Sequence, residues 1–185
     1  PAGEAPTVET REEKLRRLWA ARRFDPTQKP PELRVTFSLG GVPISTPGNL
    51  TAITAQAKVG KSALIQGFTA ATLTDSDRDC LSVVGYNSKG HSVIYVDTEQ
   101  SKDDFWWAIE RSKLRAGVSA YPTWLSPHCL SDLPVAEARD GLAVKMADEF
   151  ARCGGIHSVF VDGVADLVLD VNDAEECNGL VSDLF

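Results

Sequence analysis

Hydrophobic and polar positions along the chain follow two periods, and together they predict an ordered series of strands and helices. Alternating apolar residues and short continuous apolar runs are typical of strands, the continuous runs of strands buried on both faces. The predicted strands are 33–39, 42–44, 50–54, 93–96, 124–130 and 156–161. Apolar residues three or four positions apart indicate helices. The predicted helices are 11–23, 61–73, 101–116, 134–152 and 174–185.

Local signals mark the ends of several predicted helices. Thr10 and Glu13 have the spacing of a capping box, and Ser101 precedes two acidic residues that favour a helix start. Gly117 is the residue type that most often ends a helix. We expect the following side chains of these helices to face the protein core: Phe105, Trp106, Ile109, Leu142, Met146 and Phe150.

Strands and helices alternate from residue 31 onward, which predicts an α/β fold: a mainly parallel β-sheet with helices on both faces. Residues 74–90 are polar and predict a loop or short hairpin. Residues 1–30 form a separate part, in which a Pro/Ala/Glu-rich tail expected to be disordered, a basic amphipathic helix and a proline-rich connector follow one another. The chain begins at Pro1 and stops within a predicted helix, so we expect a fragment of a longer protein.

Composition and charge exclude several classes of protein. No apolar run is long enough to cross a bilayer, so we expect no membrane partner. The four cysteines form no C-x-x-C pair or zinc-finger spacing, which favours core-filling thiols in the reduced cytoplasm. The net charge of −7 argues against this piece wrapping a phosphate backbone by itself.

One segment between the strand at 50–54 and the helix at 61–73 nearly matches a phosphate-binding loop. Such a loop presents backbone N–H groups to phosphates, its lysine reaches the β and γ phosphates, and its hydroxyl residue ligates Mg²⁺. The residues expected to surround the phosphates are Ala55, Gln56, Ala57, Lys58, Val59, Gly60, Lys61, Ser62 and Ala63. Ala55 stands where the first glycine of the pattern belongs, a departure that we interpret as tolerated.

Two further acidic segments follow apolar strands, where parallel sheets collect ligands. Asp162 ends the run S-V-F-V-D and is the expected Mg²⁺ ligand together with Ser62; the alternative is a turn residue. Glu99 follows the strand at 93–96 and is the expected catalytic base beside Lys61. Asp97 competes for that role, and Glu99 could instead cap the next helix beside Ser101.

The ordered segments AQAKVGKS, VIYVDTEQ and SVFVDGVADLV resemble the RecA-like ATPases over residues 33–185. The likeness is to the branch of RepA-type replicative helicases, KaiC-like proteins and AAA-labelled ATPases of mobile elements. In RecA an Asp-x-Glu segment carries the catalytic base, so the resemblance supports Glu99. It implies ATP and Mg²⁺ as cofactors, a C-terminally incomplete RecA-like core over 31–185, a homo-oligomeric ring with six subunits as one option, and DNA contacts through parts beyond this chain.

The function expected from these features is ATP binding and hydrolysis by a helicase-like motor, acting on nucleic acid in replication or mobilisation of a genetic element. One alternative is a non-catalytic module that binds ATP as a regulatory signal and would be indifferent to Glu99→Gln. A P-loop kinase is a second alternative. It would need a lid with several arginines after Asp162, and residues 163–185 contain no arginine.

Overall fold

The computed structural model of the chain describes residues 9–29, 32, 34–56, 58–76 and 78–183. Contacts divide the chain into two compact units, residues 1–33 and 34–185, which are described separately. Within the described residues, no helix has both the length and the apolar character needed to span a membrane.

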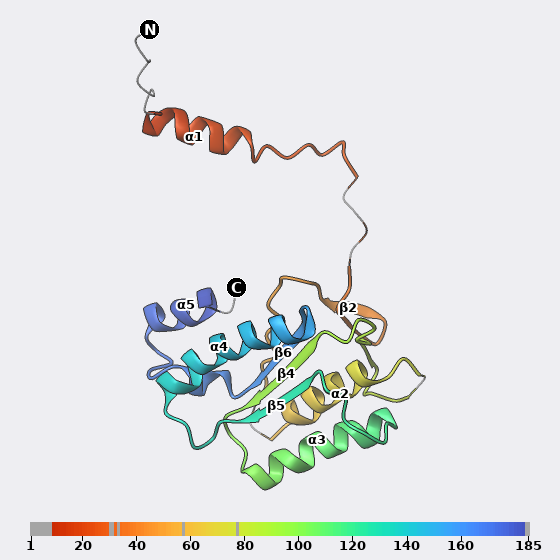
Figure 1. Cartoon of the computed structure of the whole chain (residues 1–185). Helices are drawn as coiled ribbons and strands as arrows, with labels where there is room; N and C mark the ends of the chain where they lie inside the picture. The colour runs from red at the N-terminus through yellow and green to blue at the C-terminus, as the bar shows by residue number, and fades with distance from the viewer. Residues whose placement is uncertain (1–8, 30–31, 33, 57, 77, 184–185) are drawn as a thin grey trace. The chain divides into compact units, whose positions relative to one another are not determined.

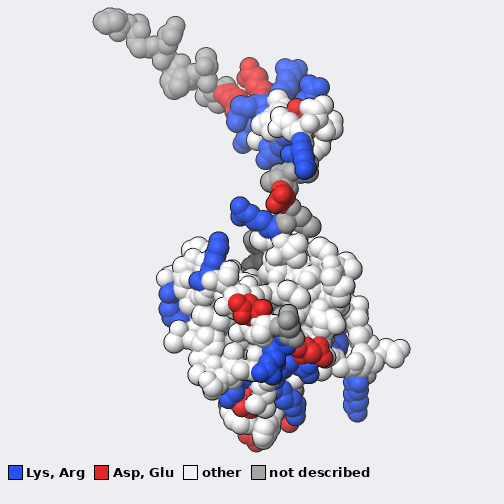
Figure 2. Space-filling model, turned by 90° about the vertical axis from the view of Figure 1, so that its right-hand side faces the viewer, with Lys and Arg blue, Asp and Glu red and all other residues white. Residues whose placement is uncertain are grey.

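The first unit contains one helix, α1 (Arg11–Ala20), which is shorter than the predicted 11–23. The predicted capping box is confirmed, because the Thr10 hydroxyl accepts from the Glu13 backbone N–H while the Glu13 carboxylate accepts from the Thr10 backbone N–H. None of its side chains is buried, and Trp19 is among the most exposed residues of the chain. Figure 2 shows basic side chains crowded around this helix. Its apolar stripe therefore packs against none of the residues of this unit that the structure describes.

The second unit is built on a parallel sheet of three strands: β4 (Ser92–Asp97), β5 (Leu125–Cys129) and β6 (Ile156–Asp162). Their order is β5-β4-β6, with β4 in the centre (Figure 1). Every residue of β4 is buried, as its continuous apolar run predicts. The predicted parallel α/β fold is confirmed, with a parallel sheet of three strands among the described residues.

Helices cover both faces of this sheet. Side chains alternate along a strand, so Val93 and Tyr95 of β4 pack in one core cluster while Ile94 and Val96 pack in another. The first cluster includes residues of α2 (Lys61–Leu73) and α3 (Lys102–Ala116), and the second includes residues of α4 (Val135–Cys153) and α5 (Ala174–Asp183). A short 3₁₀ helix that the sequence did not predict, η1 (Val164–Leu167), follows β6.

A second, antiparallel sheet contains β1 (Phe37–Leu39), β2 (Val42–Ser45) and β3 (Val83–Val84), in the order β2-β1-β3. The predicted strands 33–39 and 42–44 are both present and pair as an antiparallel hairpin, although the first is shorter than predicted. Phe37 packs edge-on against Phe68 of α2, with ring centroids 5.1 Å apart. This contact ties the small sheet to the core of the second unit.

The predicted strand at 50–54 is wrong, because that segment forms no strand in the structure. Residues 47–56 are all exposed, and the Thr51 hydroxyl donates to the carbonyl of Ile44 rather than joining a ladder. A cavity of about 190 Å³ lies between this segment and β6. A strand is stable only when a neighbour satisfies its backbone groups, and the local pattern of 50–54 cannot supply that neighbour.

Two predicted core residues are also corrected. Phe105 and Ile109 are buried as expected, but Trp106 is 55% exposed, since it lies about 100° around the helix from Phe105. On α4, Leu142 is buried and Phe150 is 60% exposed. Eight residues at 100° each place Phe150 about 80° from Leu142, whereas Glu149 lies within about 20° of it. Glu149, not Phe150, therefore occupies the buried stripe.

Candidate nucleotide-binding site

The described part of the loop before α2 leaves the start of that helix open. Gly60, the residue before the helix, has φ 96° and ψ 24°, a left-handed conformation that favours glycine, and no described side chain caps it. Lys58 is also left-handed, with φ 64°. Because the first N–H groups of a helix have no partner within it, they are free to bind an anion.

The residues predicted to surround the phosphates are placed as follows. Lys61 and Ser62 are the first two residues of α2 and are half-buried, whereas Ala63 is exposed. The loop before the helix is exposed at each of its described residues, which are Ala55, Gln56, Lys58, Val59 and Gly60. Ala57 lies outside the described residues.

The direction of α2 places its first residues at the carboxyl end of the sheet. Near the end of α2, the carbonyl of Thr72 accepts from the Asn87 N–H at 3.2 Å, and Asn87 in turn bonds the backbone of His91, next to the start of β4. The eleven steps from Thr72 back to Lys61 span about 16 Å of helix. The strand from Ser92 to its last residue spans a similar length of about 17 Å. The start of α2 therefore lies toward the carboxyl end of β4, and the end of α2 toward its amino end (Figure 1).

Two buried aspartates end the paired strands at this edge. Asp97 and Asp162 are register partners across β4 and β6. The Asp97 carboxylate accepts from the backbone N–H groups of Glu99 at 3.0 Å and Gln100 at 2.8 Å, and from the Gln100 amide. Burial raises the pKa of Asp97, and the hydrogen bonds from Gln100 only partly oppose that shift. Asp97 thus holds the turn after β4 and is not presented to water.

Asp162 differs from Asp97 in having an oxygen without a partner. Its side chain is 5% exposed, and Oδ2 is buried without a hydrogen bond. The hydroxyl of Tyr95 is likewise buried without a partner, and burial, reinforced by the neighbouring Asp162 and Asp97 carboxylates, raises the pKa of Tyr95. Buried polar atoms are normally hydrogen-bonded, so an exception calls for a ligand or another functional explanation.

The orphaned oxygen of Asp162 fits a magnesium ion, which prefers hard oxygen ligands. Among the described residues no group of three or more His, Cys, Asp or Glu side chains could hold a metal by itself. Magnesium usually takes one or two protein oxygens and completes its shell with water and phosphate. The donors that the chain offers, Asp162 and the Ser62 hydroxyl, match that pattern.

Glu99 lies beside the end of β6, although it follows β4 in the chain. A Cβ added to Gly163, the residue after Asp162, would come within 2.9 Å of Cγ of Glu99. The Glu99 side chain is exposed, in contrast to the buried Asp97. Of the two acids that compete for the role of base, Glu99 is the one that water can reach.

Sequence reasoning missed the residues that hold this edge together, namely Thr98, Gly163 and Asp166. The Thr98 backbone N–H donates to the carbonyl of Asp162 at 3.1 Å, and its hydroxyl reaches the turn after β6. The glycine after the Asp162 strand was the available signal, because φ 90° at Gly163 suits glycine alone among common residues.

An uncapped helix that begins at the lysine of a Gly-Lys-Ser segment, together with acids at the ends of adjacent parallel strands, is typical of a P-loop ATPase. The chain belongs to the AAA domain family, whose model matches residues 9–184. No curated protein and no solved structure matches the chain.

Proposed function

We propose that this protein hydrolyses Mg·ATP as a RecA-like ATPase, working as a homo-oligomeric ring on nucleic acid in replication or mobilisation of a genetic element. The observation that carries the proposal is the Glu99 turn lying against the end of β6 at the carboxyl edge of the parallel sheet, the edge where such sheets bind ligands. The uncapped start of α2 supports it as an anion-binding site. Membership of the AAA domain family supports the ATPase part. The RecA-like branch rests on the order of the three motifs.

Each residue of the site has a role that its position supports. Lys61, at the start of α2, would neutralise charge on the β and γ phosphates while the free N–H groups beside it bind their oxygens. Ser62 and Asp162 would hold Mg²⁺, which offsets the charge that develops on the phosphates. Glu99, exposed beside them, would accept a hydrogen bond from the attacking water and orient it.

A ring is supported by exposed aromatic surface next to this edge. Trp106 and Trp107 lie in the second turn of α3, which begins three residues after Glu99, and both indoles are largely exposed. Large exposed apolar side chains beside a site are typical of surfaces that another protein covers. A second copy seated there would close the open side of the candidate site.

The test is to measure nucleotide binding and ATP turnover of the chain, with and without single-stranded DNA. Lys61→Ala is expected to lose binding, while Glu99→Gln keeps binding and loses turnover by roughly a hundredfold or more. Lys89→Ala and Glu137→Gln, exposed residues outside the site, are the matched controls. Stimulation by DNA would support the nucleic-acid role.

Each contrary outcome has a clear meaning. Binding that survives Lys61→Ala would overturn the site. Binding without turnover in the wild type, unchanged in Glu99→Gln, would support a regulatory module instead. Phosphate transfer to a small molecule rather than to water would support a kinase.

A further inference from the structure

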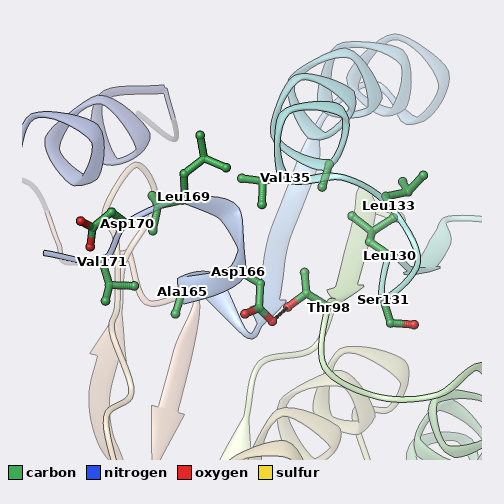
Figure 3. A pocket seen from close by; sticks show the side chains of 12 residues that line it. Thr98, Leu130, Ser131, Leu133, Val135, Ala165, Asp166, Leu169, Asp170 and Val171 are labelled. Atoms are coloured by element: carbon green, nitrogen blue, oxygen red, sulfur yellow. Dashed lines mark hydrogen bonds between the residues drawn. The ribbon is translucent and has the colours of Figure 1, made fainter. Parts of the chain in front are cut away.

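The Thr98 hydroxyl sits between the Glu99 turn and the turn that follows β6. Three oxygens lie within its reach: the carbonyls of Asp162 at 3.2 Å and Gly163 at 2.9 Å, and Oδ2 of Asp166 at 2.9 Å. A hydroxyl donates one proton, so these acceptors compete for it. Figure 3 shows the Thr98 and Asp166 side chains pointing toward each other across this junction.

Close packing at Gly163 leaves no room for a side chain between the two turns. A Cβ at this position would lie 2.1 Å from the Thr98 hydroxyl and 2.9 Å from Cγ of Glu99. The glycine also has φ 90°. The Glu99 side chain therefore lies next to the turn after β6, and the Thr98 hydroxyl beside it bonds that turn.

The two residues before Glu99 both anchor it. The Asp97 carboxylate accepts from the Glu99 backbone N–H, and the Thr98 hydroxyl bonds Asp166 in the turn after β6. The first anchor is buried, whereas the Thr98–Asp166 hydrogen bond is exposed at a cavity of about 440 Å³. A change at the protein surface can therefore affect the Thr98–Asp166 hydrogen bond more directly than the buried Asp97 anchor.

The segment that carries Asp166 contains buried residues followed by exposed ones. Leu167 and Val168 are buried in the core cluster on the α4 side. After them, the apolar side chains of Leu169 (82% exposed) and Val171 project into solvent. Asp166 lies within η1, whose last residue is the buried Leu167.

We propose that Thr98 and Asp166 are positioning residues for Glu99, and that they couple the 163–171 segment to ATP turnover. The inference rests on the proposed function, because it assigns a consequence to the orientation of Glu99. With the Thr98–Asp166 hydrogen bond formed, the carboxylate of Glu99 is held where water can be oriented. With the bond broken, Glu99 remains in the chain but loses its alignment, and turnover falls while nucleotide binding persists.

The first test is kinetic and uses the whole chain. Thr98→Val keeps the side-chain shape and removes the donor, Thr98→Ser restores a donor, and Asp166→Ala removes the side-chain acceptor and leaves only the two carbonyls. Thr98→Val and Asp166→Ala are expected to lower kcat by roughly tenfold to a hundredfold, as misplacement of a catalytic group by about 1 Å does. Affinity for fluorescent ADP with Mg²⁺ stays within about twofold in every variant. Asp148→Ala, which removes an exposed aspartate outside this segment, is the matched control.

The double variant Thr98→Val/Glu99→Gln tests whether Thr98 acts through Glu99. Residues that work as a unit are non-additive, so the double variant should turn over no more slowly than Glu99→Gln alone. Thr98→Ser should recover most of the wild-type rate. Wild-type kcat in Thr98→Val, or a further tenfold loss in the double variant, would overturn the inference.

A second readout keeps the inference separate from the proposed function. Amide hydrogen exchange over residues 97–101 should accelerate at least about fivefold in Thr98→Val and remain unchanged in Asp148→Ala. If the wild type shows no turnover, the proposed function fails and exchange alone decides the positioning role. Unchanged exchange in Thr98→Val would then overturn it.

Discussion

Buried carboxylates lie at both ends of the parallel sheet, and Asp162 at one end differs from Glu149 at the other in its hydrogen bonds. At the carboxyl end, Asp162 leaves one buried oxygen unbonded. At the amino end, Glu149 of α4 is 2% exposed and both of its oxygens are bonded. Its partners are Ser92 at 2.7 Å, Ser126 at 3.1 Å, Lys145 at 2.7 Å and Arg152, which donates through both Nε and its terminal nitrogen. The saturated carboxylate holds α4 to β4 and β5, whereas the unsaturated one is left free for a ligand.

Removing the saturated carboxylate is expected to have the largest effect on folding. Glu149→Ala should lower the free energy of unfolding by about 3–5 kcal/mol, because it leaves two cations and two buried hydroxyls without their shared acceptor. Asp148→Ala, an exposed neighbour on the same helix, is the control and should change stability by less than about 0.5 kcal/mol. Urea denaturation of both variants measures the difference. Equal losses would show that Glu149 does not anchor α4.

Lowering the pH should also weaken the anchor formed by Glu149, with a smaller loss of stability than the Glu149→Ala substitution causes. Burial raises the pKa of Glu149, but the hydrogen bonds from its cations and serines outweigh it and bring the pKa from 4.5 to about 2. A pKa lowered on folding stabilises the protein above the unfolded value and loses that contribution as pH falls. About 3 kcal/mol should therefore disappear between pH 4.5 and pH 2.

The acid prediction has its own control in Glu149→Gln, which cannot ionise. Stability curves of this variant and of the wild type, measured by urea denaturation at successive pH values, should converge as the pH falls through this window. A gap that stays constant from pH 5 to pH 2 would contradict the assignment of the low pKa to Glu149.

Replacing Asp162, the unsaturated carboxylate, should have the smallest effect on folding stability and a large effect on ligand affinity. Asp162→Asn is expected to change the free energy of unfolding by no more than about 1 kcal/mol, because Oδ2 has no hydrogen bond to lose. Magnesium-dependent affinity for fluorescent ADP should nevertheless fall by at least about tenfold. A loss of stability as large as that of Glu149→Ala would place Asp162 among the structural carboxylates.

Local sequence patterns were sufficient for several individual helices and strands. The continuous apolar run of β4, the capping signals of α1 and α3 and the glycine after α3 each act within a few residues, and each is confirmed. The ends of β4 and β6 could also be placed at one edge, because parallel strands point the same way. These features depend on short-range sterics and burial, which the local pattern encodes.

The features that failed depend on distant partners. The segment at 50–54 has a strand pattern, but no neighbouring strand pairs with it, so its backbone joins no β-ladder. Glu149 continues an apolar stripe, and only its partners from β4, β5 and α4 itself make its burial acceptable. The Thr98–Asp166 contact joins residues 68 positions apart, and no local period predicts it.

Helix α1 has ten residues, and none of them is buried. Isolated helices shorter than about 12–15 residues are marginal in water, and helix–coil exchange takes about a microsecond or less. What favours the helix here is local: a capping box and exposed ion pairs such as Arg17 with Glu9 at 2.9 Å. Its helicity should therefore fade gradually with heat and salt instead of melting in step with the sheet, and a circular-dichroism melt of the whole chain would carry a sloping component beneath its cooperative transition.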